Sequence, residues 1–325
     1  MSKLDKLGEW KNPGKVFITG ASAGIGASYA KAFAENGFDL VLLARRKDRL
    51  QALANLLESD CSIHCEIITA DLSEKEDIKK AANHIRQIDN LDMLINNAGF
   101  ATVGCFTDIP IEKSMRMFHT HMTATVQFTH AALQVMIKRK RGAIINVSSM
   151  GAFTLTPGNV LYDATKSFIA TFSENLWLEV RDKGIKVQAL CPGFTRTEFH
   201  EVGDFKNFDK SSIPDSLWMM PDEVVWLSLE ALEKVETLSL FLDGKTVCLN
   251  GLFSTAPLSG KAYKKESKIG IYEQTNKKKV VNDVVLNPVA LGLACFHFLL
   301  SPCRSSSMPY RRKFIHLALC CTGII

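Results

Sequence analysis

The chain has 325 residues, of which 46% are hydrophobic and 22% are charged, an ordinary composition for a globular protein. This composition excludes a mostly disordered protein, a collagen-like fibre and a small scaffold held by disulfides. The net charge is +5, but the segment from Lys261 to the end carries eleven basic and three acidic residues, a local charge of +8. Because the first 260 residues are therefore mildly acidic, the basic total does not indicate a nucleic-acid-binding fold.

Apolar, strand-like runs alternate with helix-like stretches along the chain as far as Gly251. Strands are predicted at residues 15–19, 39–44, 65–69, 91–95, 143–147, 186–191 and 245–249. Helices are predicted at residues 27–36, 48–58, 112–141, 159–183 and 221–234, with a further one after the capping-box pair Ser73 and Glu76. Such an alternation is typical of a parallel sheet covered on both faces. The sequence therefore predicts an α/β fold with a single doubly wound parallel sheet of Rossmann type.

This pattern stops after Gly251, so we predict one domain over residues 1–260 and a basic, partly apolar extension over residues 261–325. The apolar stretches 286–300 and 314–325 are each shorter than the roughly 20 residues of a spanning helix. The extension is expected to be disordered, or to dock on an anionic membrane surface. Because residues 1–15 are polar and lack an apolar signal segment, a cytoplasmic location with reduced cysteines is expected.

A glycine-rich turn lies between the first predicted strand and the first predicted helix. It contains Gly20, Ser22, Gly24, Ile25 and Gly26. Glycines permit a tight turn and a close approach of the backbone, and the free N–H groups at a helix N-terminus hold an anion. The placement predicts a binding site for the pyrophosphate of a dinucleotide, with a simple tight turn as the alternative.

The spacing Thr19-Gly20-x-x-x-Gly24-x-Gly26 resembles the glycine motif of the short-chain dehydrogenases and reductases. Three more motifs of that family follow in order, namely Asn96-Asn97-Ala98-Gly99, Tyr162-x-x-x-Lys166 with Ser149 upstream, and Pro192-Gly193. The resemblance covers about residues 12–252. It implies an oxidoreductase that transfers a hydride between a nicotinamide dinucleotide and a carbonyl compound or secondary alcohol. The run from Ala44 to Leu50 is similar to the general reductase branch.

Two arginines follow the second predicted strand, where this fold places the adenosine ribose. An acid there would bond the 2′-hydroxyl of NAD, whereas Arg45 and Arg46 suit the 2′-phosphate of NADP. We therefore predict NADP(H) as the cofactor. The alternative is that Arg45 and Arg46 are solvated loop charges that contact no cofactor. By resemblance, the other cofactor contacts are Asp71 and Leu72 beside the adenine, Asn97 near the adenosine ribose, Ala98, Gly99, Tyr162 and Lys166, and Pro192, Gly193, Thr195 and Thr197 near the nicotinamide.

Tyr162 and Lys166 are four residues apart on a predicted helix, so they share one face. A phenol has a pKa of about 10, and a neighbouring ammonium group together with an oxidised nicotinamide would lower it. Tyr162 is therefore the predicted general acid in carbonyl reduction and the base in alcohol oxidation. Ser149 would donate a hydrogen bond to the substrate oxygen. By resemblance, Lys166 also bonds the nicotinamide ribose.

His121 is the fourth predicted catalytic residue, and it departs from the family pattern. It stands where an Asn is expected to hold a water in the proton relay with the lysine. His121 could hold that water through a ring nitrogen; otherwise the relay is impaired, or His121 is a helix residue outside it. An impaired relay would suit a second interpretation, an NADP-binding sensor or scaffold without catalysis. The intact Ser149, Tyr162 and Lys166 favour the enzyme.

A flap is predicted at about residues 198–220, over the substrate. It is rich in apolar side chains, namely Phe199, Phe205, Phe208, Leu217, Trp218, Met219 and Met220. This composition predicts a hydrophobic ketone, aldehyde or oxo-lipid as the substrate, with simple packing as the alternative. No metal site is expected, because Cys61 and Cys65 lack a second ligand pair at zinc-like spacing. The resemblance implies a homodimer or homotetramer built through the two long helices.

Overall fold

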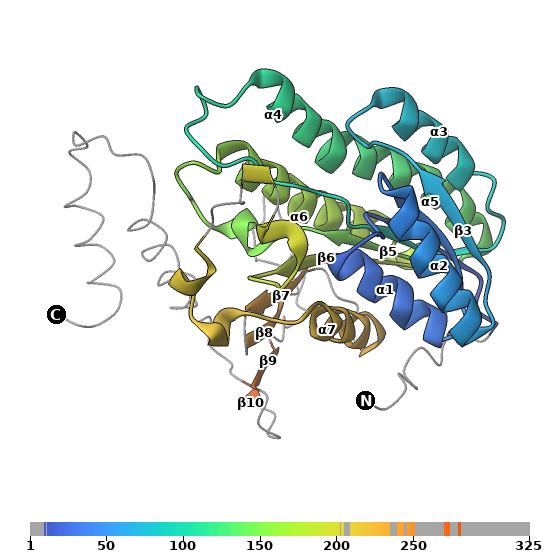
Figure 1. Ribbon diagram of the computed structural model, residues 1–325. Coiled ribbons are helices and arrows are strands. Elements are labelled where there is room, and N and C mark those ends of the chain that lie inside the picture. Colours follow the sequence, from blue (N-terminus) through green and yellow to red (C-terminus); the bar gives the residue numbers. More distant parts are fainter. Residues whose placement is uncertain are drawn as a thin grey trace, which may run out of the picture.

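The computed structural model describes residues 10, 12–201, 203–204, 209–234, 239–243, 246–250, 270–273 and 279–280. Within them the strands form a single sheet in the order β10-β9-β8-β7-β6-β5-β4-β1-β2-β3 (Figure 1). The parallel strands are β1 (Lys15–Thr19), β2 (Asp39–Ala44), β3 (Cys65–Thr69), β4 (Leu91–Asn96), β5 (Gly142–Val147), β6 (Ile185–Pro192) and β7 (Ser239–Asp243). The antiparallel additions are β8 (Thr246–Asn250), β9 (Gly270–Glu273) and β10 (Lys279–Val280).

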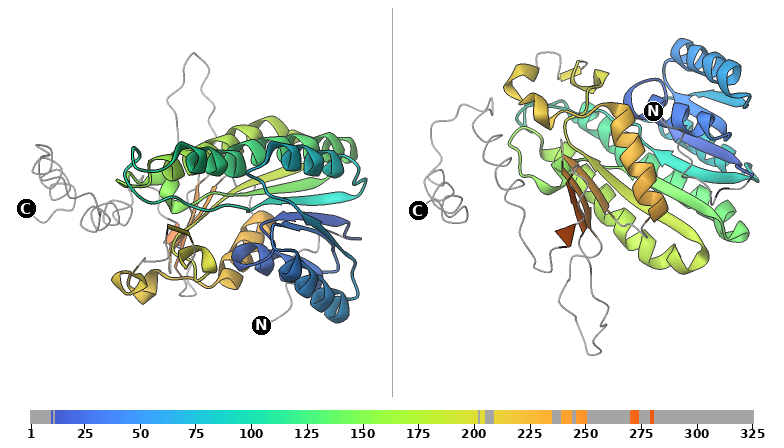
Figure 2. Two further views of the ribbon diagram at one scale, coloured as in Figure 1. Left: turned by 45° about the horizontal axis from the view of Figure 1, so that its top comes forward. Right: turned by 90° about the horizontal axis from the view of Figure 1, so that it is seen from below.

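Helices cover both faces of this sheet, and the three layers are separate in Figure 2. One face carries α1 (Gly24–Glu35), α2 (Lys47–Cys61) and α7 (Pro221–Lys234). The other face carries α3 (Lys75–Ile85), α4 (Ile111–Phe118), α5 (Ala124–Arg139) and α6 (Val160–Val180). The predicted doubly wound parallel sheet is therefore confirmed.

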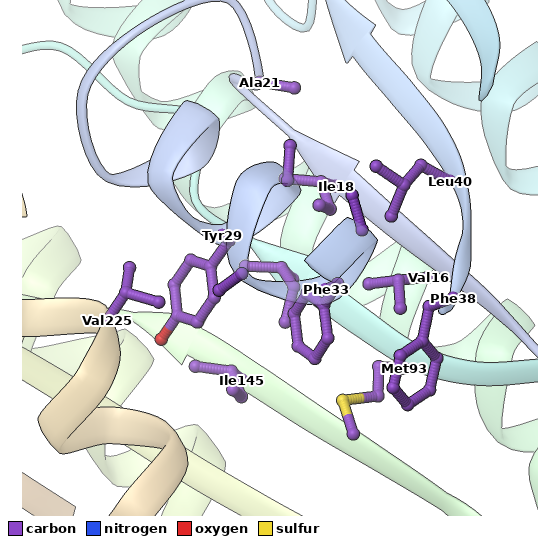
Figure 3. Packing of buried hydrophobic residues seen from close by; sticks show 14 of the residues in the cluster. Val16, Ile18, Ala21, Tyr29, Phe33, Phe38, Leu40, Met93, Ile145 and Val225 are labelled. Carbon is purple, nitrogen blue, oxygen red and sulfur yellow. The ribbon is translucent and has the colours of Figure 1, made fainter. Parts of the chain in front are cut away.

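The central strands are almost uniformly apolar because both of their faces are buried. Val16 and Ile18 of β1 point into the core under α1, whereas Phe17 between them points into the core under α5. In the first core, Phe33 stacks on Tyr29 with ring centroids 5.9 Å apart and meets Phe38 edge-on at 5.4 Å (Figure 3). The helices are thus held to the sheet by aromatic and aliphatic packing on each side.

Several predicted elements differ from the observed ones. The predicted helix 112–141 is interrupted by a π-helical turn at His119–Thr123. Ser73 does not cap the next helix, because its hydroxyl donates to Asp71 and α3 starts at Lys75. Strand β7 was not predicted, and the strand expected at 245–249 is observed one residue later as β8.

The C-terminal predictions fall mainly on residues that the structure does not describe. The apolar stretches 286–300 and 314–325 lie outside the described residues. Strands β9 and β10 belong to the predicted extension and pair onto the edge of the sheet, and the boundary at residue 260 stays a prediction. In the described part of the chain no helix has the length and apolar character to cross a membrane.

Cysteines were expected to be reduced. Cys61, Cys65 and Cys191 carry free thiols, but Cys105 is disulfide-bonded. The expectation is therefore wrong at Cys105, because proximity in the folded chain, which sequence spacing does not reveal, decides which thiols can pair.

The strand order places the carboxyl ends of β1 and β4 side by side, where the chain changes direction across the sheet. Ligands of open α/β sheets bind in the crevice at such a switch point. The glycine-rich turn follows β1 and the Asn97 segment follows β4, so the fold brings both to one crevice.

Opposite this crevice, at the amino ends of the central strands, the buried Asp92 of β4 joins several segments of the chain. Its carboxylate accepts hydrogen bonds from the Gly14 amide at 2.7 Å, from Arg139 at 2.9 Å and from Arg141 at 2.7 Å. Asp92→Asn should lower the free energy of unfolding by about 2 kcal/mol, because a neutral amide accepts the charged bonds poorly. Urea unfolding of this variant beside Asp89→Asn, an exposed control in the turn that precedes β4, checks this, and equal midpoints would contradict it.

Candidate active site

A cavity of about 990 Å³ opens at the carboxyl ends of the parallel strands. Most of the predicted site residues line it, namely Gly20, Ser22, Gly24, Ile25, Arg45, Arg46, Asp71, Leu72, Asn97, Ala98, Gly99, Ser149, Tyr162, Lys166, Pro192, Gly193, Thr195 and Thr197. Gly26 and His121 lie behind this wall rather than in it. The volume is at the upper end of the range of small-molecule and cofactor pockets.

The glycine-rich turn is tied to β4 by Asn97. Its side-chain amide donates to the Thr19 carbonyl at 2.9 Å and to the Gly20 carbonyl at 3.3 Å. The Thr19 hydroxyl in turn accepts from the Asn97 amide at 2.9 Å and from the Ala98 amide at 3.0 Å. Gly20 has a φ of 67°, which favours glycine, and a Cβ on Gly26 would lie 2.4 Å from the Gly20 carbonyl oxygen.

Helix α1 presents its N-terminus to the cavity. Its N-cap is Ala23, and the described residues supply neither a side-chain cap nor an acid in the first turn. The first backbone N–H groups of α1 have no partner inside the helix, so they and the positive end of the helix dipole can bind an anion.

Two arginines lie beside the turn, and their surroundings differ. Arg46 donates to the Ser22 hydroxyl at 3.0 Å and to the Glu198 carboxylate at 2.7 Å. Arg45 is largely exposed and lies 3.9 Å from Asp71. Burial raises the pKa of Asp71, but hydrogen bonds from Ser73 and the nearby guanidinium groups outweigh it, so the pKa is lowered. Arg46 is therefore the more ordered of the two cations.

Ser149, Tyr162 and Lys166 come together on the other half of the cavity. Tyr162 and Ser149 both lie beside Gly151 on the cavity wall, and the Ser149 hydroxyl accepts from the Gly151 amide at 3.0 Å. The Lys166 ammonium lies 5.7 Å from the centre of the Tyr162 ring and donates to the Val147 carbonyl at 3.0 Å. The spacing of four residues on α6 places the phenol and the amine on one helix face, as expected.

The protein's own groups do not acidify the phenol. Burial is the largest influence and raises the pKa of Tyr162 to about 12, the hydrogen bond from Ser149 lowers it, and the charge of Asp163 raises it. Burial also lowers the pKa of Lys166 to about 8. Lys166 was expected to lower this pKa, but it is not among these causes, and the phenol is protonated at neutral pH.

His121 is almost fully buried behind Gly99, within the π-helical turn. Its Nε2 accepts from the Phe100 amide at 3.2 Å, and its Nδ1 lies 2.9 Å from the Thr165 hydroxyl. Burial and the charge of Lys166 hold the pKa of His121 well below its usual range, so the ring is neutral. Because Nε2 accepts, the ring proton belongs on Nδ1, where it faces Thr165. Both ring nitrogens are therefore engaged by the protein.

The flap closes the substrate end with aromatic side chains. The Phe199 ring lies 6.0 Å from that of Tyr162 and 5.2 Å from that of His200. Trp218 packs on Phe194 at 5.4 Å and on His200 at 5.2 Å, so the wall beside the phenol is apolar and aromatic. Phe205 and Phe208 of the predicted flap lie outside the described residues.

Sequence reasoning missed several residues that shape the site. Thr165 links His121 to the catalytic helix, since its hydroxyl donates to the Tyr162 carbonyl at 2.8 Å. Asp163 lines the cavity, and burial raises its pKa to about 7. Both stand within the Tyr-x-x-x-Lys motif and could have been noticed there. Glu198 gives no comparable local signal, because its partners Arg46 and Arg49 are far away along the chain.

The sequence pattern of the short chain dehydrogenase family matches residues 14–204. A very-long-chain 3-oxoacyl-CoA reductase from Anas platyrhynchos is 31% identical over 208 residues, which are 63% of this chain and 65% of that protein. A solved short-chain dehydrogenase from Sphingobium yanoikuyae in complex with NADPH is 36% identical, with a TM-score of 0.66 over 70% of this chain and 87% of that one. A bulky-bulky ketone specific alcohol dehydrogenase from Comamonas testosteroni is 32% identical, with a TM-score of 0.63 over 71% and 86%.

The family pattern covers more than half of the chain and includes the glycine-rich turn, β1 to β6, and the segments that carry Ser149, Tyr162 and Lys166. The solved relatives share the fold over a still larger part of the chain. Sequence pattern, fold and the location of the motif residues thus agree, and the chain belongs to the short-chain dehydrogenase/reductase family of oxidoreductases.

Proposed function

We propose that the protein uses NADPH to reduce a bulky, hydrophobic ketone or oxo-acyl compound, with Tyr162 as the proton donor. One observation carries this proposal. Ser149 and Tyr162, with the Lys166 ammonium over the Tyr162 ring, line the same cavity as the glycine-rich turn and Arg46. A carbonyl oxygen and a dinucleotide can therefore be bound next to each other.

The cofactor half fits a phosphorylated dinucleotide. The free N–H groups at the start of α1 suit the pyrophosphate, and Gly24, with a φ of 56°, keeps the backbone open to it. Arg46 and Ser22 offer charged and neutral donors for a 2′-phosphate. When bound, NADPH supplies the hydride. The NADPH complex of the Sphingobium relative supports this choice.

The protonated phenol suits reduction. A neutral Tyr162 can donate its proton to the carbonyl oxygen as negative charge develops there, while Ser149 donates a second hydrogen bond to the same oxygen. Lys166 lies below the ring, and its positive charge stabilises the phenolate that remains after the transfer. Alcohol oxidation needs the phenolate first, so it depends on the positive charge of an oxidised nicotinamide to overcome the raised pKa.

The substrate half suits a large apolar group. Phe199 and Phe194 form its aromatic wall, with Trp218 packed against Phe194, and the outer loop before α6 exposes Phe153 and Leu155 beside the cavity. Such surfaces bind apolar ligands by removing both from water. The relatives described as acting on bulky-bulky ketones and very-long-chain 3-oxoacyl-CoA support a substrate of this kind.

Tyr162→Phe tests the proposed chemistry. Loss of the donated proton should reduce turnover by about 10²- to 10⁴-fold, while NADPH still binds. Absorbance of NADPH with a panel of bulky ketones measures turnover, and fluorescence titration measures binding. A variant that consumes NADPH at the wild-type rate would exclude Tyr162 as the donor. Binding by the wild-type protein without turnover on any ketone would favour the sensor instead.

Arg46→Ala tests the cofactor assignment. The wild-type protein should bind NADPH at least about tenfold more tightly than NADH, because a charged hydrogen bond contributes about 1.5–3 kcal/mol. The substitution should weaken NADPH binding by a similar factor and leave NADH binding almost unchanged. Equal affinities of the wild-type protein for the two cofactors, measured by titration, would rule out the preference.

His121 is proposed as a positioning residue that joins the loop at Phe100 to the helix of Tyr162. His121→Ala should lower kcat about tenfold with little change in KM, because α6 loses a buried hydrogen bond. His121→Asn should restore turnover, since an amide can accept from Phe100 and donate to Thr165. The pH profile of kcat should stay in place in both variants. A displaced profile would instead indicate that the imidazole takes part in proton transfer.

A further inference from the structure

Glu198 is the one flap carboxylate described here that reaches the cofactor half of the cavity. It follows the loop after β6 and begins the short helical turn Glu198–His200. One oxygen accepts from Arg46 at 2.7 Å, and the other accepts from Arg49. The two hydrogen bonds, more than the opposing effect of burial, hold the pKa of Glu198 below its usual range. The carboxylate is therefore an anion bound between two guanidinium groups.

Its position coincides with the place where a ligand phosphate is expected. Arg46 is bonded to Ser22 of the glycine-rich turn and to Glu198 at the same time. Both Ser22 and Glu198 line the cavity. A cation that faces the adenosine end of a dinucleotide site thus already has an anionic partner from the chain itself.

The contact is of a kind that a stronger anion can displace. Side chains of Glu198, Arg46 and Arg49 remain 35%, 40% and 45% exposed, and exposed ion pairs contribute little to stability. A phosphate monoester carries up to two charges and three acceptor oxygens, so it offers more than a single carboxylate can. It would also repel Glu198 if both stayed at the same guanidinium group.

We propose that Glu198 occupies the binding site of the 2′-phosphate and that NADP(H) displaces it, so that Glu198 sets how strongly the protein discriminates NADP(H) from NAD(H). The inference rests on the proposed function, because it assumes that Arg46 meets the 2′-phosphate. NAD(H) has a hydroxyl at that position and leaves Glu198 with its arginines. Only the cofactor with a 2′-phosphate therefore competes with Glu198 for Arg46.

The displacement also reaches the catalytic end. Thr197, just before Glu198, packs against Gly24. A Cβ added to Gly24 would lie 3.0 Å from the methyl group of Thr197. Phe199, just after it, lies against the ring of Tyr162. Release of Glu198 therefore removes the central anchor of the segment Thr197–Phe199. The residue before Glu198 touches the glycine-rich turn, and the residue after it touches the ring of Tyr162.

The test compares Glu198→Gln with Glu201→Gln. Glu201 is an exposed acid three residues further along the same flap, paired with Lys210 at 2.6 Å, so its substitution removes the same charge away from Arg46. Fluorescence titration measures the dissociation constants of NADPH, NADH and adenosine 2′-phosphate without any turnover. Thermal unfolding midpoints verify that the variants fold. If Glu198→Gln does not fold, Glu198→Asp, which has a shorter side chain, takes its place in the test.

Glu198→Gln should lower the dissociation constants of NADPH and adenosine 2′-phosphate by about three- to tenfold. The dissociation constant of NADH should change by less than about twofold. Glu198→Asp should tighten NADPH by less. Glu201→Gln should leave all three constants near the wild-type values. NADPH binding that is unchanged or weaker in Glu198→Gln overturns the inference, as does equal tightening of NADH. If NADPH binds to neither the wild-type protein nor the variants, the proposed function fails as well.

Discussion

The hydrogen bonds between Thr19 and the Asn97 segment are the constraint on which the rest of the site depends. Thr19 ends β1 and Asn97 follows β4, and these two strands lie side by side although 76 residues separate Thr19 from Ile95, whose carbonyl accepts from the Thr19 hydroxyl. The side-chain amide of Asn97 donates to the carbonyls of Thr19 and Gly20 and so fixes the turn. The turn can therefore present its N–H groups outward, and Gly26 can pack where a methyl group would not fit.

The residues around Asn97 also lie close to the buried titratable groups His121 and Lys166. Gly99, two residues after Asn97, has a backbone so close to His121 that an added Cβ would lie 2.8 Å from Nε2. His121 stays neutral because it is buried and near Lys166, and Lys166 itself has a lowered pKa. A protein interior that disfavours charge on all these groups also keeps the phenol protonated. The phenol therefore holds its proton at neutral pH.

Much of this could be predicted from the sequence, because the fold depends on local patterns. The apolar run 39–44 and the glycine spacing at 20–26 each identify an element without reference to distant residues. The π-helical turn at His119–Thr123 contains neither Gly nor Pro to mark it. Strand β7 is an apolar run of only five residues, which is too short for periodicity to separate strand from helix. The pKa of Tyr162 depends on burial, which only the folded chain reveals.

The partners of Glu198 show most clearly where sequence reasoning ends. An acid after Thr197 has no visible relation to Arg46, 152 positions earlier. In the folded chain, however, Thr197 touches the glycine-rich turn, Glu198 binds the arginines and Phe199 lies against the Tyr162 ring. Asp204 anchors the same flap on the far side through Lys113 and the Val103 amide. Carboxylates thus hold this segment on both sides of the cavity, and both ion pairs join residues about 90 or more positions apart, so neither could be read from local sequence.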